Sequence, residues 1–209
     1  MLTDVTVRQT SLEDKKLEIV KWAFDRFYEA GFHVAGIDSV MAGSGIPKHT
    51  FDEYFSSKEE LIEAVLEYYG AGIVCQLFDP VISASDDPRQ QIVAFFEMRK
   101  VAIDQSPVRG CLGIKAAQEY LGKHENITAL GRNAALGVEQ QFIAMCERAH
   151  FRESEKLGKE INILFQGALL LSQVHGNSSP FVSAKSAVAA LLEKASAEGS
   201  RGNGARNGQ

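Results

Sequence analysis

Apolar residues recur at spacings of three and four along most of the chain, and runs that alternate apolar with polar residues are scarce. This period places apolar side chains on one face of a helix. Glycine, proline and short polar turns separate the helical stretches. We therefore expect an all-α protein. The predicted helices cover residues 12–30, 37–44, 47–54, 58–76, 88–105, 110–121, 126–150, 153–176 and 182–197.

The helical stretches fall into two groups. Ser11 can cap the first helix, Gly31 can end it, and Ser57 with Glu60 forms a capping box for the fourth. Three short helices thus precede a connecting helix and a larger bundle. The pattern predicts an N-terminal module over 12–57, a C-terminal bundle over 58–198, and a disordered tail over 199–209, which lacks the apolar content to pack.

Residues 37–55 have the form of a helix-turn-helix. Two apolar clusters separated by a glycine-containing turn can pack one short helix across another. The side chains expected to point inward are Ile37, Val40, Met41, Ile46, Phe51 and Phe55. Lys48, His49 and Thr50 are then left facing outward at the start of the second helix. A helix with that presentation can enter the major groove of DNA.

These stretches resemble the N-terminal region of the TetR family. The resemblance covers residues 17–65, and a weaker one continues beyond it. The segments that carry it are Ala23–Phe27, Ala30–Phe32, Ser44–Phe51 and Tyr54–Leu61, followed by the weaker Arg109–Leu112 and Ala116–Glu119. It implies a three-helix DNA-binding module joined by a connecting helix to a C-terminal helical bundle that dimerises.

The resemblance also assigns roles. The recognition helix falls on Lys48–Phe55, and Lys58 matches a lysine that lies near the phosphate backbone in relatives. The DNA contacts it implies are Lys48, His49, Thr50, Tyr54 and Lys58. The chain departs from the family at Asp52, where a tyrosine is usual, and at Ala35–Gly36, where a hydroxyl residue is usual. Both changes remove expected phosphate partners.

The bundle is predicted to dimerise and to bind a small molecule. The helix over 153–176 is apolar around much of its circumference, more than one intramolecular face requires. A two-fold dimer would present two recognition helices to a palindromic operator. Relatives enclose an effector in the bundle, and the candidate residues here are Tyr68, Phe96, Arg99, Cys111, Tyr120 and Phe142. The effector is unknown.

Cys111 has two interpretations. Its setting in Arg109–Leu112 resembles that of a cysteine which some relatives use to sense electrophiles or oxidants. Arg109, Lys115 and the amides at a helix start can make a thiol a better nucleophile. Alternatively, Cys111 is a small buried apolar residue.

Composition and charge limit the possible partners and location of the protein. The 209 residues carry a net charge of −5, so any attraction to DNA is local. No apolar run is long enough to cross a membrane, and no signal peptide begins the chain, so we expect a cytoplasmic protein. Three widely spaced cysteines suggest no disulfide framework and no zinc site.

Two other classes of function remain for comparison. A di-metal enzyme needs two Glu-x-x-His motifs, but only Glu147–His150 fits, so we expect no catalytic residue, metal or cofactor. A protein-interaction module that kept the fold and lost DNA binding is the main alternative, because of Asp52 and the acidic surroundings of the motif. The favoured function is a repressor that releases operator DNA when an effector, or modification of Cys111, acts on the bundle.

Overall fold

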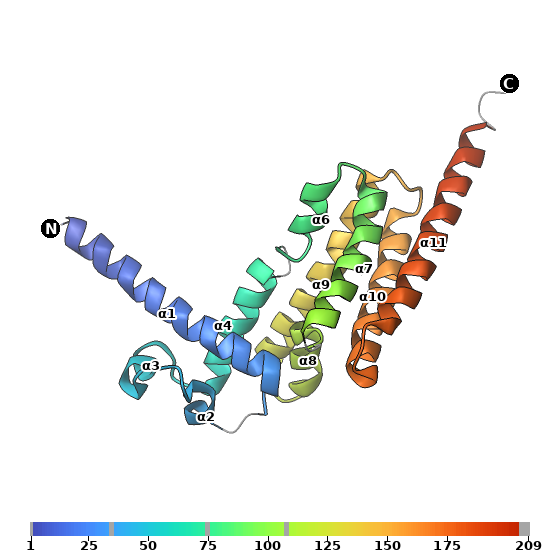
Figure 1. Cartoon of the computed structure of the whole chain (residues 1–209). Helices are drawn as coiled ribbons and strands as arrows, with labels where there is room; N and C mark the ends of the chain where they lie inside the picture. Colours follow the sequence, from blue (N-terminus) through green and yellow to red (C-terminus); the bar gives the residue numbers. More distant parts are fainter. Residues whose placement is uncertain (1, 34–35, 74–75, 107–108, 205–209) are drawn as a thin grey trace. The chain divides into compact units, whose positions relative to one another are not determined.

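A computed structural model describes residues 2–33, 36–73, 76–106 and 109–204, and the regular elements in these ranges are all helical (Figure 1). The prediction of an all-α protein is confirmed. A π-helical turn, η1 (Tyr69–Ile73), follows α4. The α-helices are α1 (Leu2–Ala30), α2 (Ile37–Met41), α3 (Lys48–Tyr54), α4 (Lys58–Tyr68), α6 (Asp79–Ala84), α7 (Pro88–Gln105), α8 (Leu112–Glu119), α9 (Glu125–Arg148), α10 (Ser154–His175) and α11 (Ser179–Gly204).

The chain packs as two compact units. Unit 1 consists of Met1–Gly72 with Leu112–Ala134, and unit 2 consists of Ile73–Cys111 with Ala135–Gln209. Helix α9 therefore begins in unit 1 and ends in unit 2. The sequence divides the chain by function after residue 57, whereas packing groups α4, α8 and the start of α9 with the helix-turn-helix.

Unit 1 has a core between α1 and α4. On α1, Ile19, Ala23 and Phe27 recur every fourth residue and are all buried, because this spacing puts them on one helix face. Helix α4 contacts α1 and buries Leu61 and Ile62. These apolar faces fix the two helices that flank the helix-turn-helix.

Helices α8 and α9 approach each other closely within unit 1. A Cβ atom added to Gly131 would lie 2.7 Å from the carbonyl oxygen of Gly113 and 2.8 Å from the amide nitrogen of Ala117. Such distances are shorter than van der Waals contact, so a glycine is needed at this crossing. The start of α9 is thereby held directly against the backbone of α8.

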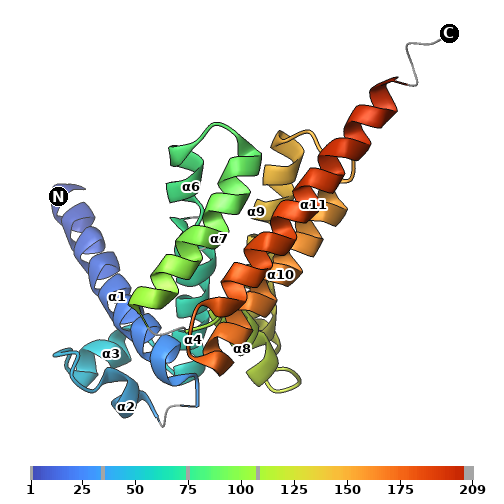
Figure 2. The ribbon, with the colours of Figure 1, turned by 45° about the vertical axis from the view of Figure 1, so that its right-hand side comes forward.

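Unit 2 is built around a cluster of phenylalanine rings from five of its segments. Neighbouring ring centroids lie 4.3 to 6.3 Å apart, in stacked, tilted and edge-to-face pairs. The six members, all at most 2% exposed, are Phe78, Phe95, Phe96, Phe142, Phe165 and Phe181. Figure 2 shows α7, α10 and α11, three of the helices that carry these rings, running alongside one another.

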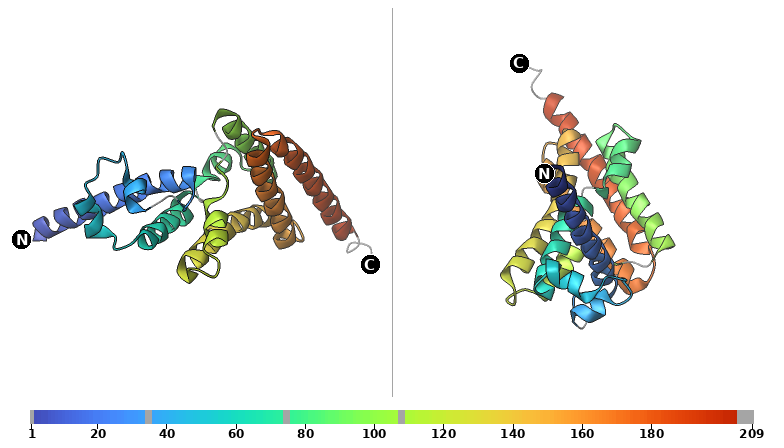
Figure 3. Two further views of the ribbon diagram at one scale, coloured as in Figure 1. Left: turned by 90° about the horizontal axis from the view of Figure 1, so that it is seen from below. Right: turned by 90° about the vertical axis from the view of Figure 1, so that its left-hand side faces the viewer.

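Helices α10 and α11 form an antiparallel hairpin (Figure 3). Gly176 ends α10 in the left-handed region, with φ of 66°, and its N–H donates to the carbonyl of Ser172. The other end of the hairpin is uneven, since the last turns of α11 run on past the start of α10 (Figures 1 and 2). On α10 itself, Ile163, Leu170 and Val174 are exposed.

Four elements differ from the sequence-based expectations. Helix α1 begins at Leu2 rather than near Ser11, because a serine inside a helix costs only a fraction of a kcal/mol. Helix α6 was not expected, yet its proline lies in the first turn, where no amide hydrogen bond is lost. The turn η1 replaces the predicted end of α4. Helix α11 includes residues 199–204 of the predicted disordered tail, and 205–209 lie outside the described residues.

Candidate nucleic-acid interface

The helix-turn-helix consists of α2, a turn and α3. Val40, Phe51 and Phe55 are buried, with the last two rings 5.5 Å apart, whereas Ile46 is only half-buried. Lys48 and His49 are exposed at the first turn of α3. Thr50, Tyr54 and Lys58 are half-buried, and Asp52 is exposed. The five residues assigned to DNA contact therefore lie along α3 and at the start of α4.

Two side chains of α1 hold α2 in place. Trp22 donates its indole N–H to the carbonyl of Val40 at 2.8 Å, and Arg26 donates to the carbonyl of Ala42 at 3.0 Å. The Arg26 guanidinium lies 5.1 Å from the Trp22 ring centroid. Helix α2 has no side-chain cap at its start, and its last carbonyls would otherwise lack partners in the helix. We call this pair the Trp22–Arg26 clamp.

Neither Trp22 nor Arg26 was singled out from the sequence. Both occupy the side of α1 that the apolar pattern leaves polar, where a hydrogen bond to a carbonyl 16 or 18 residues later leaves no local trace. The only available signal was the spacing of a lone tryptophan and an arginine one turn apart. A stacked Arg and Trp pair is common in proteins but does not reveal its acceptors.

The charged side chains around α3 are partly paired. The ammonium of Lys48 lies 3.3 Å from the carboxylate of Asp38, and both side chains are well exposed. Lys16 of α1 lies 5.4 Å from the Phe55 ring centroid. The region around α3 thus presents the ammonium groups of Lys16 and Lys48. The Asp38 carboxylate would compete with a phosphate for Lys48.

The start of α4 is tightly hydrogen-bonded. Ser57 caps the helix, because its hydroxyl accepts from the backbone N–H of Glu60 at 3.1 Å, which confirms the predicted cap. The Glu60 carboxylate accepts from the N–H and the hydroxyl of Ser56, rather than from Ser57 as in a standard capping box. The Ser56 amide, then its hydroxyl, and finally the charge of Lys16 lower the pKa of Glu60.

Two of the candidate effector residues lie in unit 1. Tyr68 meets Phe24 edge-on, with ring centroids 5.8 Å apart. Tyr120 meets Phe32 edge-on at 6.0 Å. Burial, followed by the charges of Glu119 and Glu59, raises the pKa of Tyr120 to about 12.

The other four candidates belong to unit 2. Phe96 and Phe142 are members of the six-ring cluster, so their rings already contact protein on several sides. Arg99 is half-buried, and its Nε atom is buried with no hydrogen-bond acceptor among the described residues. Cys111 is the last residue of the first segment of unit 2 and is 8% exposed.

The segment before Cys111 is constrained. Gly110 has a φ of 78°, and a Cβ added there would lie 2.6 Å from the side-chain oxygen of Gln173. The positive φ favours glycine beside the thiol, and a larger residue there would also displace the Gln173 carboxamide. Cys146 is also buried, and burial, with a smaller effect from Glu147, raises its pKa to about 12. Cys75 and Ala35 lie outside the described residues.

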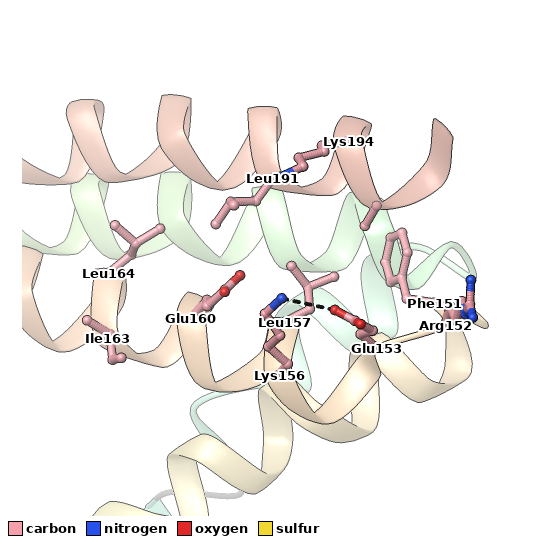
Figure 4. Close-up of a pocket in the computed structure, with 11 residues that line it drawn as sticks. Phe151, Arg152, Glu153, Lys156, Leu157, Glu160, Ile163, Leu164, Leu191 and Lys194 are labelled. Atoms are coloured by element: carbon pink, nitrogen blue, oxygen red, sulfur yellow. Dashed lines mark hydrogen bonds and ion pairs between the residues drawn. The ribbon is translucent and has the colours of Figure 1, made fainter. Parts of the chain in front are cut away.

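A groove follows the junction of α10 and α11. Figure 4 shows its larger part, about 750 Å³, where Leu157, Leu164 and Leu191 face one another and Lys156 pairs with Glu153 at the edge. A second hollow of about 470 Å³ continues it and shares Ile163 and Leu164. The groove runs beside the solvent-facing side of α10.

The solvent-facing side of α10 is unusually apolar. Ile163 is 70% exposed and Val174 is 73% exposed. Leu170, Leu171 and, from α11, Val182 extend the same surface and are also exposed. We call these five residues the α10 stripe. So many exposed large apolar side chains on one helical hairpin are typical of an interaction surface.

Two other classes of site lack their signatures in the described ranges. No three His, Cys, Asp or Glu side chains gather there as a metal site would require. Over the same ranges, none of the helices combines the length and apolar character that crossing a membrane requires.

Comparison with known proteins places these features in context. Residues 19–65 match the family model of bacterial regulatory proteins of the tetR family. The HTH-type transcriptional regulator YxaF of Bacillus subtilis, described as uncharacterized, is 27% identical over 191 residues, which span 88% of this chain and 98% of YxaF. The HTH-type transcriptional repressor NemR of Escherichia coli is 27% identical over 111 residues, spanning 53% of this chain and 56% of NemR.

Solved structures agree on the fold. The crystal structure of the reduced form of E. coli NemR superposes with a TM-score of 0.74 at 22% identity, covering 84% of this chain and 95% of NemR. SCO4454, a TetR-family regulator from Streptomyces coelicolor, superposes with a TM-score of 0.77 at 20% identity, covering 93% of this chain and 95% of SCO4454. Both comparisons extend well beyond the helix-turn-helix.

Proposed function

We propose that this chain is a DNA-binding transcriptional regulator similar to those of the TetR family. In this proposal it is a repressor whose homodimer releases a palindromic operator when an effector acts on unit 2. The observation that carries the proposal is the presentation of α3. Lys48 and His49 are exposed at its first turn, while the Trp22–Arg26 clamp fixes the helix that precedes it.

We assign five residues to the operator. Lys48, His49 and Thr50 lie at the leading end of α3, from which a recognition helix reaches base edges. Tyr54 lies one turn further on, and Lys58 is at the first turn of α4, where a cation suits a phosphate contact. Bacterial operators lie in the cytoplasm, so the proposal places the protein there.

The α10 stripe supports a homodimer. Its five apolar side chains are between 47% and 73% exposed in the single chain, and the groove shown in Figure 4 lies on the same two helices, α10 and α11. Pairing two copies of this surface about a two-fold axis buries both at once, since each stripe becomes the partner of the other. The same symmetry presents two α3 helices to the two halves of a palindrome.

The effector is proposed to act through unit 2. Arg99 indicates what chemistry an effector could have. Its buried Nε–H group is a hydrogen-bond donor that finds no acceptor among the described residues. A ligand with a carboxylate or carbonyl oxygen would satisfy it. We retain Phe96 and Phe142 as apolar contacts that must rearrange to admit a ligand, and Tyr68 and Tyr120 as candidate contacts in unit 1.

Cys111 is a second candidate input. Modification of this thiol would add bulk to a buried residue one position before α8, which packs in unit 1. The test compares parent and Cys111→Ser in a DNA-release assay with N-ethylmaleimide. Equal release would leave Cys111 as a packing residue only.

The central test is selection of DNA by the purified protein from a random duplex library across a salt series. Enrichment of a palindrome, with affinity falling as salt rises, is the expected result because lysine contacts to phosphate release counterions. Lys48→Ala should then weaken binding, while the control Lys156→Ala, in the groove of unit 2, should not. No enrichment at low salt would contradict the proposal and favour a protein-interaction module.

A further inference from the structure

His124 makes two contacts through one ring nitrogen. It lies between α8 and α9, and its Nδ1 atom accepts a hydrogen bond from the backbone N–H of Ile127 at 3.4 Å. The same Nδ1 atom lies 3.8 Å from the carboxylate of Glu63 on α4. All three residues belong to unit 1.

The two contacts require opposite protonation states. Nδ1 can accept from the Ile127 amide only through a free lone pair, so that contact belongs to the form in which Nδ1 carries no proton. It can donate to Glu63 only when it carries a proton. In the first form His124 caps α9. When both ring nitrogens carry a proton, the imidazolium instead forms an ion pair with Glu63 on α4. Histidine is the side chain that ordinarily changes charge between pH 5 and 8.

The backbone of His124 is fixed in either form. Its N–H donates to the carbonyl of Tyr120, and its own carbonyl accepts from both the N–H and the hydroxyl of Thr128, at 3.1 and 2.8 Å. The imidazole also meets the Tyr120 ring edge-on at 6.4 Å. A proton would consequently change what the ring contacts without moving the chain that carries it.

Several charged residues belong to the segments around His124. Glu63 and Glu59 belong to α4, and Glu119 ends α8, where it acts with Glu59 on Tyr120. Lys123 and Glu125 flank His124 in the chain. Among these residues carboxylates outnumber ammonium groups, and Glu63 is the one in contact with the imidazole.

A second histidine of unit 1 also lies beside a carboxylate. His33, which follows α1 and precedes the helix-turn-helix, lies 3.4 Å from the carboxylate of Glu119. Glu29, Lys115 and Lys123 line the same hollow of about 490 Å³. The contact joins the end of α8 to the residue that follows α1, ahead of the helix-turn-helix.

We propose that this regulator also senses protons, with His124 as the proton-binding site that exchanges its cap on α9 for an ion pair with Glu63 on α4. Helix α4 begins shortly after α3 ends, across the short link through Phe55 and Ser57. The ion pair would hold α4 in one position and so reduce the number of positions that α3 can adopt. Less conformational entropy is then lost on binding, so the protonated protein binds its operator more tightly. This readout in DNA affinity rests on the proposed function, whereas the exchange of contacts does not.

The first experiment uses the full chain without DNA. The amide signal of Ile127 is followed by NMR between pH 8 and 5.5 in the wild type and in His124→Asn, whose side-chain oxygen caps a helix but takes up no proton in this range. We expect the wild-type signal to move with pH as the amide loses its acceptor, and the signal of the variant to stay. Equal movement in both proteins, or none in either, would overturn the proposal.

The second experiment measures operator affinity at pH 8 and at pH 6. Between these values the wild type should gain about two- to fivefold more affinity than Glu63→Gln, the range of a partly exposed ion pair. Any contribution of His49 is common to both and cancels in the comparison. Glu67→Gln, which removes a charge one turn further along α4, is the matched control and should behave as the wild type.

The outcomes separate the two hypotheses. If Glu63→Gln keeps the full pH response, the coupling of His124 to DNA binding is wrong. If no operator is found at any salt concentration, the proposed repressor function fails, while the Ile127 amide still decides whether His124 exchanges its contacts.

Discussion

Unit 2 is stabilised by a cluster of six phenylalanine rings, whereas the helix-turn-helix of unit 1 is positioned by two hydrogen bonds from α1 to carbonyl groups at the end of α2. The free energy of burying apolar surface is non-directional and scales with the buried area. A hydrogen bond fixes the position of its acceptor to within tenths of an ångström. The contrast suits their proposed tasks, because a recognition helix needs position and a core that admits a ligand needs tolerance.

The strongest test of this contrast removes one ring. Phe165→Ala should lower the free energy of unfolding by about 3–5 kcal/mol, because a buried ring that meets four others leaves a cavity. Urea denaturation measures the loss. Phe165→Leu, which keeps most of the apolar volume, should lose much less. A loss below about 1 kcal/mol would mean that the cluster repacks freely.

The outer surface of unit 2 offers the next largest effect. Ile163→Glu combined with Val174→Glu should weaken the proposed dimer by about tenfold or more, because two carboxylates would be buried against their symmetry copies. Sedimentation velocity over a concentration series measures it. Leu136→Glu is the control, since Leu136 is half exposed but lies on α9 outside the α10 stripe. A monomeric wild type would contradict the dimer directly.

The clamp of unit 1 should matter for binding more than for stability. Trp22→Phe keeps an aromatic ring but loses the donor to Val40, so operator affinity should fall about five- to tenfold, the equivalent of one hydrogen bond. Fluorescence anisotropy with the selected operator measures this. Leu17→Ala, on the same helix but half exposed, should change affinity little. Unchanged affinity in Trp22→Phe would show that packing alone positions α2.

The smallest expected effect is at the start of α4. Ser57→Ala should cost about 1 kcal/mol through loss of the cap. Glu60→Gln should cost less, because its contacts are exposed to solvent. The pKa of Glu60 is lowered in the folded protein, so its contribution is present above the ordinary range of a glutamate and is lost as pH falls. Thermal unfolding of the wild type and Glu60→Gln at pH 7 and pH 3 should show the two proteins converging at the acidic value.

Much of the fold followed from local pattern. The burial of Phe27, Phe51 and Phe55 was predictable from spacing, and the Ser57 cap was predictable from a serine three residues before a glutamate. These features depend on neighbours in the sequence. The exposure of Lys48 and His49 follows from the same reasoning, since the apolar residues of α3 fix which side faces inward.

Features set by distant contacts were not predictable in this way. The acceptors of Trp22 and Arg26 lie on another helix, and the second partner of His124 lies far earlier in the chain, on α4. The packing of α8 in unit 1 depends on the close approach of α8 and α9 at Gly131. A glycine in the middle of a helix does not by itself predict such a contact. The Glu60 carboxylate accepts its hydrogen bonds from Ser56 rather than from Ser57, and this depends on side-chain geometry alone.

The chain crosses between the two units three times, after Gly72, Cys111 and Ala134. A chimera that joined residues 1–57 to the bundle of another regulator would therefore carry α1, α2 and α3 but would leave behind α4, α8 and the beginning of α9. Transplanting the intact DNA-reading part requires two separate segments and a splice within the first half of α9. Exchange of operator specificity between such proteins is accordingly easier by point substitution along α3 than by cutting and joining.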